Sequence, residues 1–256
     1  MHNLGKTDGP AHPSEFPHHE GIRLQAFLAH AGVASRRACE RIILDRRVSI
    51  NGTISCELGV RVQTNDIVTL DGRILESEST KRYILLFKPA GYLSAMSDPL
   101  NRPLASELLN GIKERVYNVG RLDQWSSGLL LFTNDGELAS FLVHPSGGIE
   151  KEYEITADAP LGDDFFIGFR NGVEIDGIIY RALSVERTGL ISAKVILIEG
   201  KNREIRRVLE HYGRKAKVLR RVRFGWLTLE GLVEGAYRDL SASEVEALRE
   251  FGEKNR

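Results

Sequence analysis

The sequence has few cysteines and no long hydrophobic run. Only Cys39 and Cys56 occur among 256 residues, and they fall in different predicted elements. We therefore expect no disulfide framework and a reducing, cytoplasmic location. No apolar run approaches the roughly 20 residues of a membrane-spanning helix. The first residues also lack an apolar stretch, so we expect neither a signal peptide nor membrane association.

The sequence also lacks an excess of charge of one sign. Its 35 basic and 35 acidic residues give a formal net charge of zero, which conceals strong local bias. The local bias indicates possible partners better than the total does. Hydrophobic residues make up 42% of the chain, enough for a sizeable core and too many for wholesale disorder. No spaced set of Cys, His and carboxylate residues predicts a metal site.

Composition divides the chain into four parts. Residues 1–21, with several Gly, Pro and His, predict a disordered tail. Residues 22–75 predict a compact module of two helices and a small sheet. The polar residues 76–81 predict a linker. Residues 82–256 contain many short strands that do not alternate regularly with helices, so we predict an α+β fold for this larger domain.

The first module carries a cationic helix face formed by Arg36, Arg37 and Arg41. Such a face can be an ordinary solvated surface or a surface for phosphates, and the residues alone leave both possibilities open. The run R-L-Q-A-F-L-A-H-A-G-V-A-S-R-R at 23–37, followed by R-V-S-I-N-G at 47–52, resembles the alpha-L RNA-binding module of a small-subunit ribosomal protein. This resemblance implies binding of structured RNA through phosphates and shape.

A second basic segment covers residues 200–223, where the only acids are Glu204 and Glu210. Its basic residues are Lys201, Arg203, Arg206, Arg207, Arg214, Lys215, Lys217, Arg220, Arg221 and Arg223. A predicted helix with one apolar face carries the first arginines, so they do not all lie on the same side. At least one can point into a cleft while others face a polyanion. A surface helix charged for solubility is the alternative.

Asp123 stands alone as a candidate reactive group. It follows Arg121 closely and precedes a Ser-Ser-Gly turn and a predicted buried strand, with no His, Cys or second acid beside it. A hydrolytic glycosidase needs a second carboxylate, and the nearby Asp135 and Glu137 fit a turn and helix cap better. An Asp that a guanidinium keeps ionised suits a reaction in which a base leaves a sugar carbon and is recaptured.

Five motifs, in order, resemble pseudouridine synthases of the RsuA/RluB group. They are K-P-A-G at 88–91, S-D-P at 97–99, G-R-L-D and its continuation at 120–138, E-K-E-Y at 150–153, and E-G-K-N-R-E-I-R-R at 199–207. The resemblance implies the pseudouridine synthase fold, with a mainly antiparallel mixed sheet. It also implies isomerisation of a uridine in ribosomal RNA without metal or cofactor. The runs at 135–139 and 144–146 are most similar to the subgroup that modifies large-subunit rRNA.

The resemblance assigns roles to single residues. It makes Asp123 the catalytic carboxylate, Tyr153 the ring that stacks on the target uracil, and Arg206 the partner of Asp123. Arg121 would support the extruded nucleotide or fill the gap that it leaves. The full set expected to bind RNA is Arg36, Arg37, Arg41, Lys88, Arg121, Lys201, Arg203 and Arg207. Whether Asp123 forms an ester with the sugar or abstracts the C2′ proton stays open.

Several positions depart from the usual pattern of the group. Phe87 replaces a common Asn, Ser127 replaces a common Thr, and residues 100–102 replace a frequent Gly-Arg pair. None of these positions is Asp123, Tyr153 or Arg206. Three other functions stay open: a small-subunit rRNA pseudouridine synthase, a non-catalytic rRNA-binding assembly protein, and a hydrolytic nucleosidase. In each case we expect a monomer whose partner is ribosomal RNA.

Overall fold

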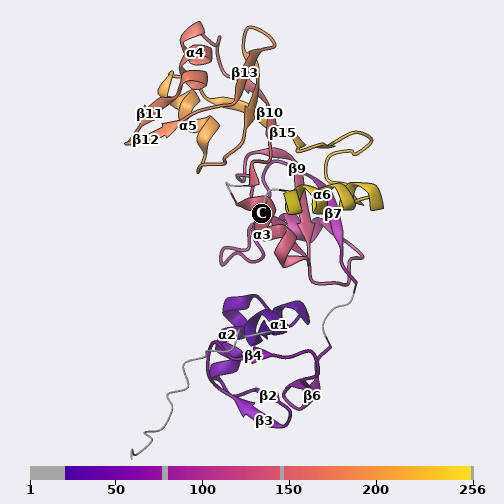
Figure 1. Ribbon diagram of the computed structural model, residues 1–256. Helices are drawn as coiled ribbons and strands as arrows, with labels where there is room; N and C mark the ends of the chain where they lie inside the picture. Colours follow the sequence, from indigo (N-terminus) through magenta and orange to yellow (C-terminus); the bar gives the residue numbers. More distant parts are fainter. Residues whose placement is uncertain (1–20, 77–79, 145–146, 255–256) are drawn as a thin grey trace, which may run out of the picture. The chain divides into compact units, whose positions relative to one another are not determined.

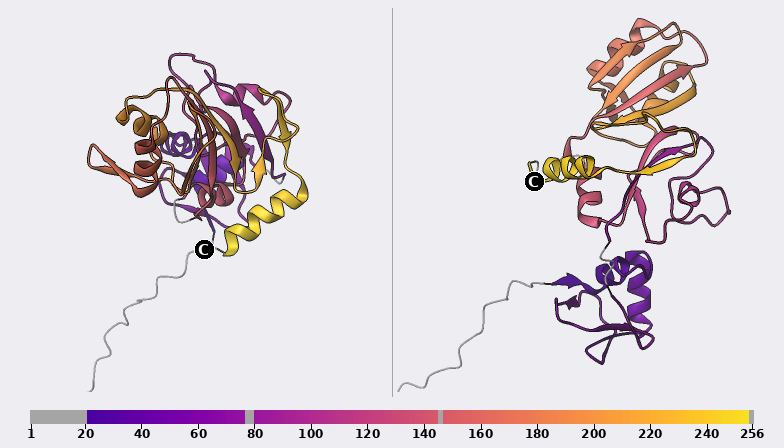
Figure 2. Two further views of the ribbon diagram at one scale, coloured as in Figure 1. Left: turned by 90° about the horizontal axis from the view of Figure 1, so that it is seen from above. Right: turned by 90° about the vertical axis from the view of Figure 1, so that its right-hand side faces the viewer.

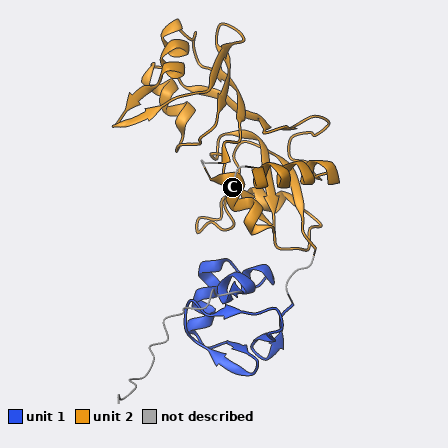
Figure 3. Cartoon of the chain, in the orientation of Figure 1, with its two compact units in different colours: residues 1–79 blue, residues 80–256 orange. Residues whose placement is uncertain are grey.

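The computed structural model describes residues 21–76, 80–144 and 147–254 (Figure 1). The chain divides into two compact units, residues 1–79 and 80–256 (Figure 3). Nearly all of the tail expected at 1–21, and the middle of the linker expected at 76–81, lie outside the described residues. Within the described ranges, no helix has the length and apolar character needed to cross a membrane.

Unit 1 packs two helices against short antiparallel strands (Figure 1). The helices are α1 (Leu24–His30) and α2 (Arg36–Leu44). The strands are β1 (Ile22–Arg23), β2 (Val48–Ile50), β3 (Thr53–Ser55), β4 (Arg61–Val62), β5 (Val68–Leu70) and β6 (Arg73–Ile74). Strands β3-β2-β5-β6 form one sheet in that order, and β1 pairs with β4. The expected module of two helices and a small sheet is confirmed.

Local sequence signals explain the boundaries in unit 1. Ser35 caps α2, because its hydroxyl accepts a hydrogen bond from the Ala38 backbone N–H at 3.2 Å. Asn51 and Gly52 have φ angles of 51° and 83° and form the tight turn between β2 and β3. Apolar residues of both layers, including Leu28 and Ile43, are completely buried between the helices and strands.

Unit 2 is built on one large mixed sheet. Its strand order is β13-β14-β10-β15-β9-β7-β17, with β16 beside β15 and β8 beside β9. Their bounds are β7 (Tyr83–Lys88), β8 (Tyr117–Val119), β9 (Ser127–Thr133), β10 (Lys151–Ala157), β13 (Ser184–Arg187), β14 (Ser192–Leu197), β15 (Ala216–Phe224), β16 (Leu227–Thr228) and β17 (Tyr237–Asp239). Among these described strands, only β15 and β9 pair in parallel, which confirms the mainly antiparallel mixed sheet. A separate hairpin joins β11 (Val173–Ile175) and β12 (Ile178–Tyr180).

Helices cover both ends of this sheet. They are the short 3-10 helix η1 (Ala105–Leu108), α3 (Gly136–Val143), α4 (Asp163–Asn171), α5 (Glu204–His211) and α6 (Ala242–Lys254). Figure 1 shows α4 and α5 with β10 to β15 at one end of the unit, and α3 and α6 with β7 and β9 at the other. The yellow helix α6 packs on α3 through Phe251 and Phe141, whose ring centroids are 6.0 Å apart (Figures 1 and 2).

Several elements of unit 2 are not predicted from the sequence, namely α4, β8, β13, β15, β16 and β17. Helix α4 is not predicted, because aromatic residues and Gly168 give the segment a low intrinsic helix propensity. Burial of Phe165 and Phe169 in the core stabilises this helix instead. The long strand β15 is not predicted either, because its arginines obscure an alternating apolar pattern.

The parallel pair β9–β15 joins the two ends of the sheet. Its register places Arg220 opposite Ser127 and Arg221 opposite Gly128. Strand β9 is buried on both faces of the sheet. Leu129 and Leu131 belong to one cluster of buried apolar residues, and Leu130 belongs to a second cluster. Because the loop that contains Asp123 leads directly into β9, this strand fixes the loop at the junction of the two ends.

Candidate active site

Asp123 begins a tight turn that is tied to a neighbouring loop. The Ser126 N–H donates to the Asp123 carbonyl at 3.0 Å, closing the turn. The Gly91 N–H donates to the Gln124 carbonyl at 2.7 Å, and the Gln124 side-chain amide donates back to the Gly91 carbonyl at 3.2 Å. Just before the turn, the Ser94 hydroxyl bonds both the N–H and the carbonyl of Leu122. The backbone of Asp123 is therefore held on both sides.

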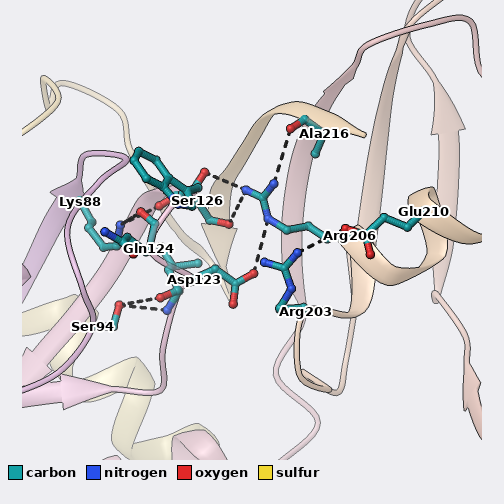
Figure 4. Close-up of polar contacts among 11 residues, drawn as sticks. Lys88, Ser94, Asp123, Gln124, Ser126, Arg203, Arg206, Glu210 and Ala216 are labelled. Atoms are coloured by element: carbon teal, nitrogen blue, oxygen red, sulfur yellow. Dashed lines mark hydrogen bonds and ion pairs between the residues drawn. The ribbon is translucent and has the colours of Figure 1, made fainter. Parts of the chain in front are cut away.

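Lys88 supports the same turn from inside. Its side chain is completely buried, and its ammonium group donates to the carbonyls of Pro89 and Ser126 at 2.7 Å and of Gln124 at 3.4 Å (Figure 4). Burial lowers the pKa of Lys88 to about 8, although the negative charge of Asp123 opposes this change. The expectation that Lys88 contacts RNA is wrong, because all three ammonium hydrogens point into the protein. Lys88 positions the turn.

Arg206 reaches Asp123 from helix α5. Its Nε lies 3.6 Å from Asp123 Oδ2, and the two side chains are 10% and 30% exposed. This distance defines an ion pair without a formed hydrogen bond. The guanidinium is fixed by other contacts, because its Nη2 donates to the Trp125 carbonyl at 2.7 Å and the Ser126 hydroxyl at 3.3 Å (Figure 4). Burial lowers the pKa of Arg206, and the Asp123 carboxylate opposes this change.

A cleft opens above this ion pair. Its volume is about 440 Å³, including space open to solvent. Side chains from separate elements form its walls: Arg121, Leu122, Asp123, Ser126, Tyr153, Leu197, Lys201, Arg203, Glu204, Ile205 and Leu219. Tyr153 comes from β10 and is half-buried. The cleft thus combines a half-buried carboxylate, an aromatic ring, apolar side chains and basic residues in its walls.

The structure brings together some of the basic residues expected to bind RNA. Arg121, Lys201 and Arg203 all line the cleft. Lys201 forms an ion pair with Glu199 at 2.7 Å, and Arg203 forms one with Glu210 at 3.3 Å. Each keeps part of its side chain exposed, 34% and 43% respectively, so each remains accessible to a phosphate. Their contacts with RNA stay predictions.

The other expected RNA-binding residues lie elsewhere. Arg207 does not line the cleft and instead lies 3.5 Å from Asp176 in the turn between β11 and β12. Arg36, Arg37 and Arg41 are exposed residues of unit 1. Their roles also stay predictions.

The basic residues of the second segment do not all face solvent. Arg221 is only 3% exposed. Arg223 forms ion pairs with Glu150 at 2.9 Å and Glu152 at 3.0 Å. These acids belong to a distant stretch of the chain that becomes a neighbour only when β10 pairs with β15. Sequence reasoning considers the acids within the segment and therefore misses them.

Sequence reasoning also misses a second carboxylate in the cleft wall. Glu204 is 4% exposed, and its Oε2 accepts a hydrogen bond from the Lys201 backbone N–H at 3.0 Å. Burial raises the pKa of Glu204. Its place at the first turn of α5 indicates a helix-capping role, and no sequence signal separates it from the surrounding charges. In the part of the chain that the structure describes, no group of three or more His, Cys, Asp and Glu residues has a metal-binding arrangement.

Comparisons with known proteins identify both units. Residues 82–211 match the RNA pseudouridylate synthase family, and residues 22–68 match the S4 domain. The ribosomal large subunit pseudouridine synthase B of Bacillus subtilis is 37% identical over 89% of this chain and 95% of its own length. The dual-specificity RNA pseudouridine synthase RluF of Shigella flexneri is 34% identical over 88% of this chain and 77% of its own.

A solved structure agrees with these matches. A crystal structure of a pseudouridylate synthase covers 89% of this chain and 100% of its own, with a TM-score of 0.65 and 26% identity. The fold, the family match and the relatives all lead to one assignment. The chain belongs to the RNA pseudouridine synthase family, and an S4 domain precedes its catalytic domain.

Proposed function

We propose that this enzyme converts one uridine of large-subunit ribosomal RNA to pseudouridine, with Asp123 as the catalytic carboxylate. The observation that carries the proposal is the ion pair of Asp123 with Arg206 at the base of a cleft that Tyr153 also lines. The preference for large-subunit RNA rests on the likeness to the Bacillus subtilis enzyme, which spans nearly all of both chains.

The cleft suits a nucleotide taken out of an RNA stack. The Tyr153 ring and the apolar side chains of Leu197, Ile205 and Leu219 offer surfaces for a flat base. Arg121 at the rim would hold the extruded nucleotide or fill the gap that it leaves. Target recognition in this scheme combines the cleft with the S4 domain, whose exposed Arg36, Arg37 and Arg41 supply contacts to phosphates.

The reaction needs one ionised carboxylate at the sugar. The bond between uracil N1 and ribose C1′ breaks, the uracil rotates within the cleft, and a bond forms between C5 and C1′. The C5 proton leaves to solvent and N1 gains a proton, so atoms balance without water being consumed. Asp123 either attacks C1′ or removes the C2′ proton, and both routes need it ionised. The Arg206 guanidinium, with its Nε 3.6 Å from Asp123 Oδ2, places a positive charge beside this carboxylate.

Tritium release tests the proposal. Large-subunit rRNA fragments labelled at uridine C5 should release tritium with the purified protein, without added metal or cofactor, and Asp123→Asn should abolish the release. Release from small-subunit fragments alone would move the target to that subunit. Binding without release from any fragment would indicate a non-catalytic assembly protein. Free uracil among the products would indicate a nucleosidase, for which Glu204 would be the second carboxylate.

A further inference from the structure

A second cavity adjoins the catalytic cleft. The two share Arg121, Tyr153 and Gly200 in their walls. The second cavity measures about 780 Å³, including space open to solvent. Its lining includes the apolar residues Val119, Leu142, Val143, Ile198 and Phe224. The shared residues make it a neighbour of the cleft.

Positive charge lies beside Phe224 in the cavity wall: the Arg221 guanidinium carbon is 5.5 Å and the Lys151 ammonium nitrogen 6.0 Å from the centroid of its ring. Arg221 is 3% exposed, and its Nε donates to the Leu129 carbonyl at 2.8 Å. Its Nη2 is buried and has no hydrogen-bond partner among the described residues. An unused donor of a charged group at this depth is costly unless something else supplies the acceptor.

Lys151 adds a second cation, which is half-buried. Its ammonium group donates to the carbonyls of Ile149 at 2.9 Å and Ile198 at 2.5 Å, which leaves one hydrogen free. Burial lowers the pKa of Lys151 to about 8, and the charge of Arg221 contributes to this change. Within the described ranges, neither Lys151 nor Arg221 has a carboxylate at ion-pair distance.

Among the described residues, the one carboxylate in the cavity wall is already paired. Glu199 lines the cavity, but it lies 2.7 Å from Lys201 and its side chain is 55% exposed. Among the described residues, it forms no ion pair with Lys151 or Arg221. An RNA strand would bring these two cations a negative charge at each phosphodiester.

We propose that this cavity binds the nucleotide next to the target uridine, with its phosphodiester group facing Lys151 and Arg221. The shared wall supports this assignment, because a strand that places one nucleotide against Tyr153 continues into the neighbouring space. The apolar side chains of Val119, Leu142 and Val143 in the wall are available to the base or ribose of that nucleotide. The proposal rests on the proposed place of the target uridine in the Asp123 cleft.

Salt dependence of RNA binding tests the charge interaction. The measurement uses full-length Asp123→Asn protein, so that binding is read without turnover, and adds Lys151→Gln. Removing one ion pair with a phosphate should weaken binding about tenfold. It should also lower the slope of log affinity against log salt by about one unit. Lys151→Arg should restore both values. Lys113→Gln removes an exposed lysine that lines neither cavity and should change neither.

An unchanged salt slope for Lys151→Gln would overturn the proposal, because a purely structural role alters stability without changing the number of neutralised phosphates. Thermal unfolding of each variant separates that outcome from misfolding. If Lys151→Gln unfolds, Arg221→Gln takes its place, because it also removes one positive charge and should lower the same slope.

Neutral linkages test which part of the nucleotide is bound. Two RNAs are compared, one with a neutral methylphosphonate linkage on the 5′ side of the target and one with it on the 3′ side. One of the two should bind the Asp123→Asn protein with the native Lys151 more weakly than unmodified RNA does. At that position, Lys151→Gln should add no further loss. If the losses in affinity from the methylphosphonate and from Lys151→Gln add up at both positions, the proposal is contradicted. It is also contradicted if the effect of Lys151→Gln disappears only with RNA that lacks the neighbouring base, because the cavity would then bind the base. Tritium release by enzyme with an intact Asp123 is measured separately, so failure of the catalytic proposal is distinguishable.

Discussion

The backbone of Gly128 lies directly against the backbone of Arg221. A Cβ atom at Gly128 would stand 2.2 Å from the Arg221 carbonyl oxygen, and the φ angle of Gly128 is +114°. This close approach lies in the parallel pair of β9 and β15, five residues after Asp123 in the chain. The two strands therefore require glycine at this point, where they hold the turn of Asp123 against the half of the sheet that carries Arg206.

Gly128→Ala should destabilise the protein and reduce activity together. The clash with backbone cannot be relieved by a side-chain movement, so we expect a loss of about 3 kcal/mol or more in unfolding free energy. Denaturant unfolding and tritium release measure the two effects. Gly231→Ala is the control, because Gly231 also has a positive φ but no atom within 4 Å of the added carbon. Equal losses in the two variants would show that φ alone, without the clash, accounts for the effect.

Arg206→Lys should lower kcat with little change in KM. A lysine keeps the positive charge but cannot hold the Trp125 carbonyl, the Ser126 hydroxyl and the Asp123 carboxylate at once. We expect at least about a tenfold loss in kcat, equivalent to roughly 1.4 kcal/mol in the transition state. Single-turnover tritium release at saturating RNA measures it. His211→Gln, at an exposed position of the same helix, should react like the parent enzyme, and an equal loss there would mean that α5 itself is disturbed.

Lys88 should make stability depend on pH in the alkaline range. Its pKa is lowered in the folded protein from 10.5 to about 8, so between these values the unfolded chain binds more protons than the folded one. The free energy of unfolding contributed by this group therefore rises as the pH is raised from about 8 to 10.5. It is lost when the pH is lowered again to about 8. Lys88→Met should remove that part of the rise in urea unfolding measured across this range. The pKa of Lys151 is lowered in a similar way, and its contribution to the pH dependence remains in Lys88→Met. A pH profile of stability identical to that of the parent protein would contradict the prediction.

The three arginines of α2 should contribute to RNA affinity without affecting the chemistry. Replacing Arg36, Arg37 and Arg41 by Gln in the full chain should weaken rRNA binding and lower its salt slope by about one unit for each phosphate that is no longer neutralised. Tritium release at saturating RNA should stay close to that of the parent. The matched control replaces the same residues by Lys, which keeps the charge and should keep the slope. Unchanged binding by the Gln variant would leave the cationic face as an ordinary solvated surface.

Local features of the fold could be predicted because their causes are local. The cap at Ser35 and the turn at Asn51 and Gly52 each depend on a few neighbouring residues. The same is true of Asp135, which the sequence places in a turn and helix cap and which accepts a hydrogen bond from Leu138 N–H at 3.2 Å at the start of α3. Helix α4 could not be predicted in this way, because its stability comes from phenylalanines inside a core assembled from distant strands.

The sequence by itself determined the family, the order of the motifs and the position of Asp123, because each is written in contiguous residues. The resemblance carried by its motifs also named Arg206 as the partner of Asp123, and the two side chains form an ion pair in the structure. Only the tertiary structure decided which basic residues face solvent. Lys88 and Arg221 are buried in the folded protein. Arg223 forms ion pairs with Glu150 and Glu152, which the pairing of β10 with β15 brings next to it. Burial and charge compensation depend on neighbours in space, and the packing of the sheet selects those neighbours.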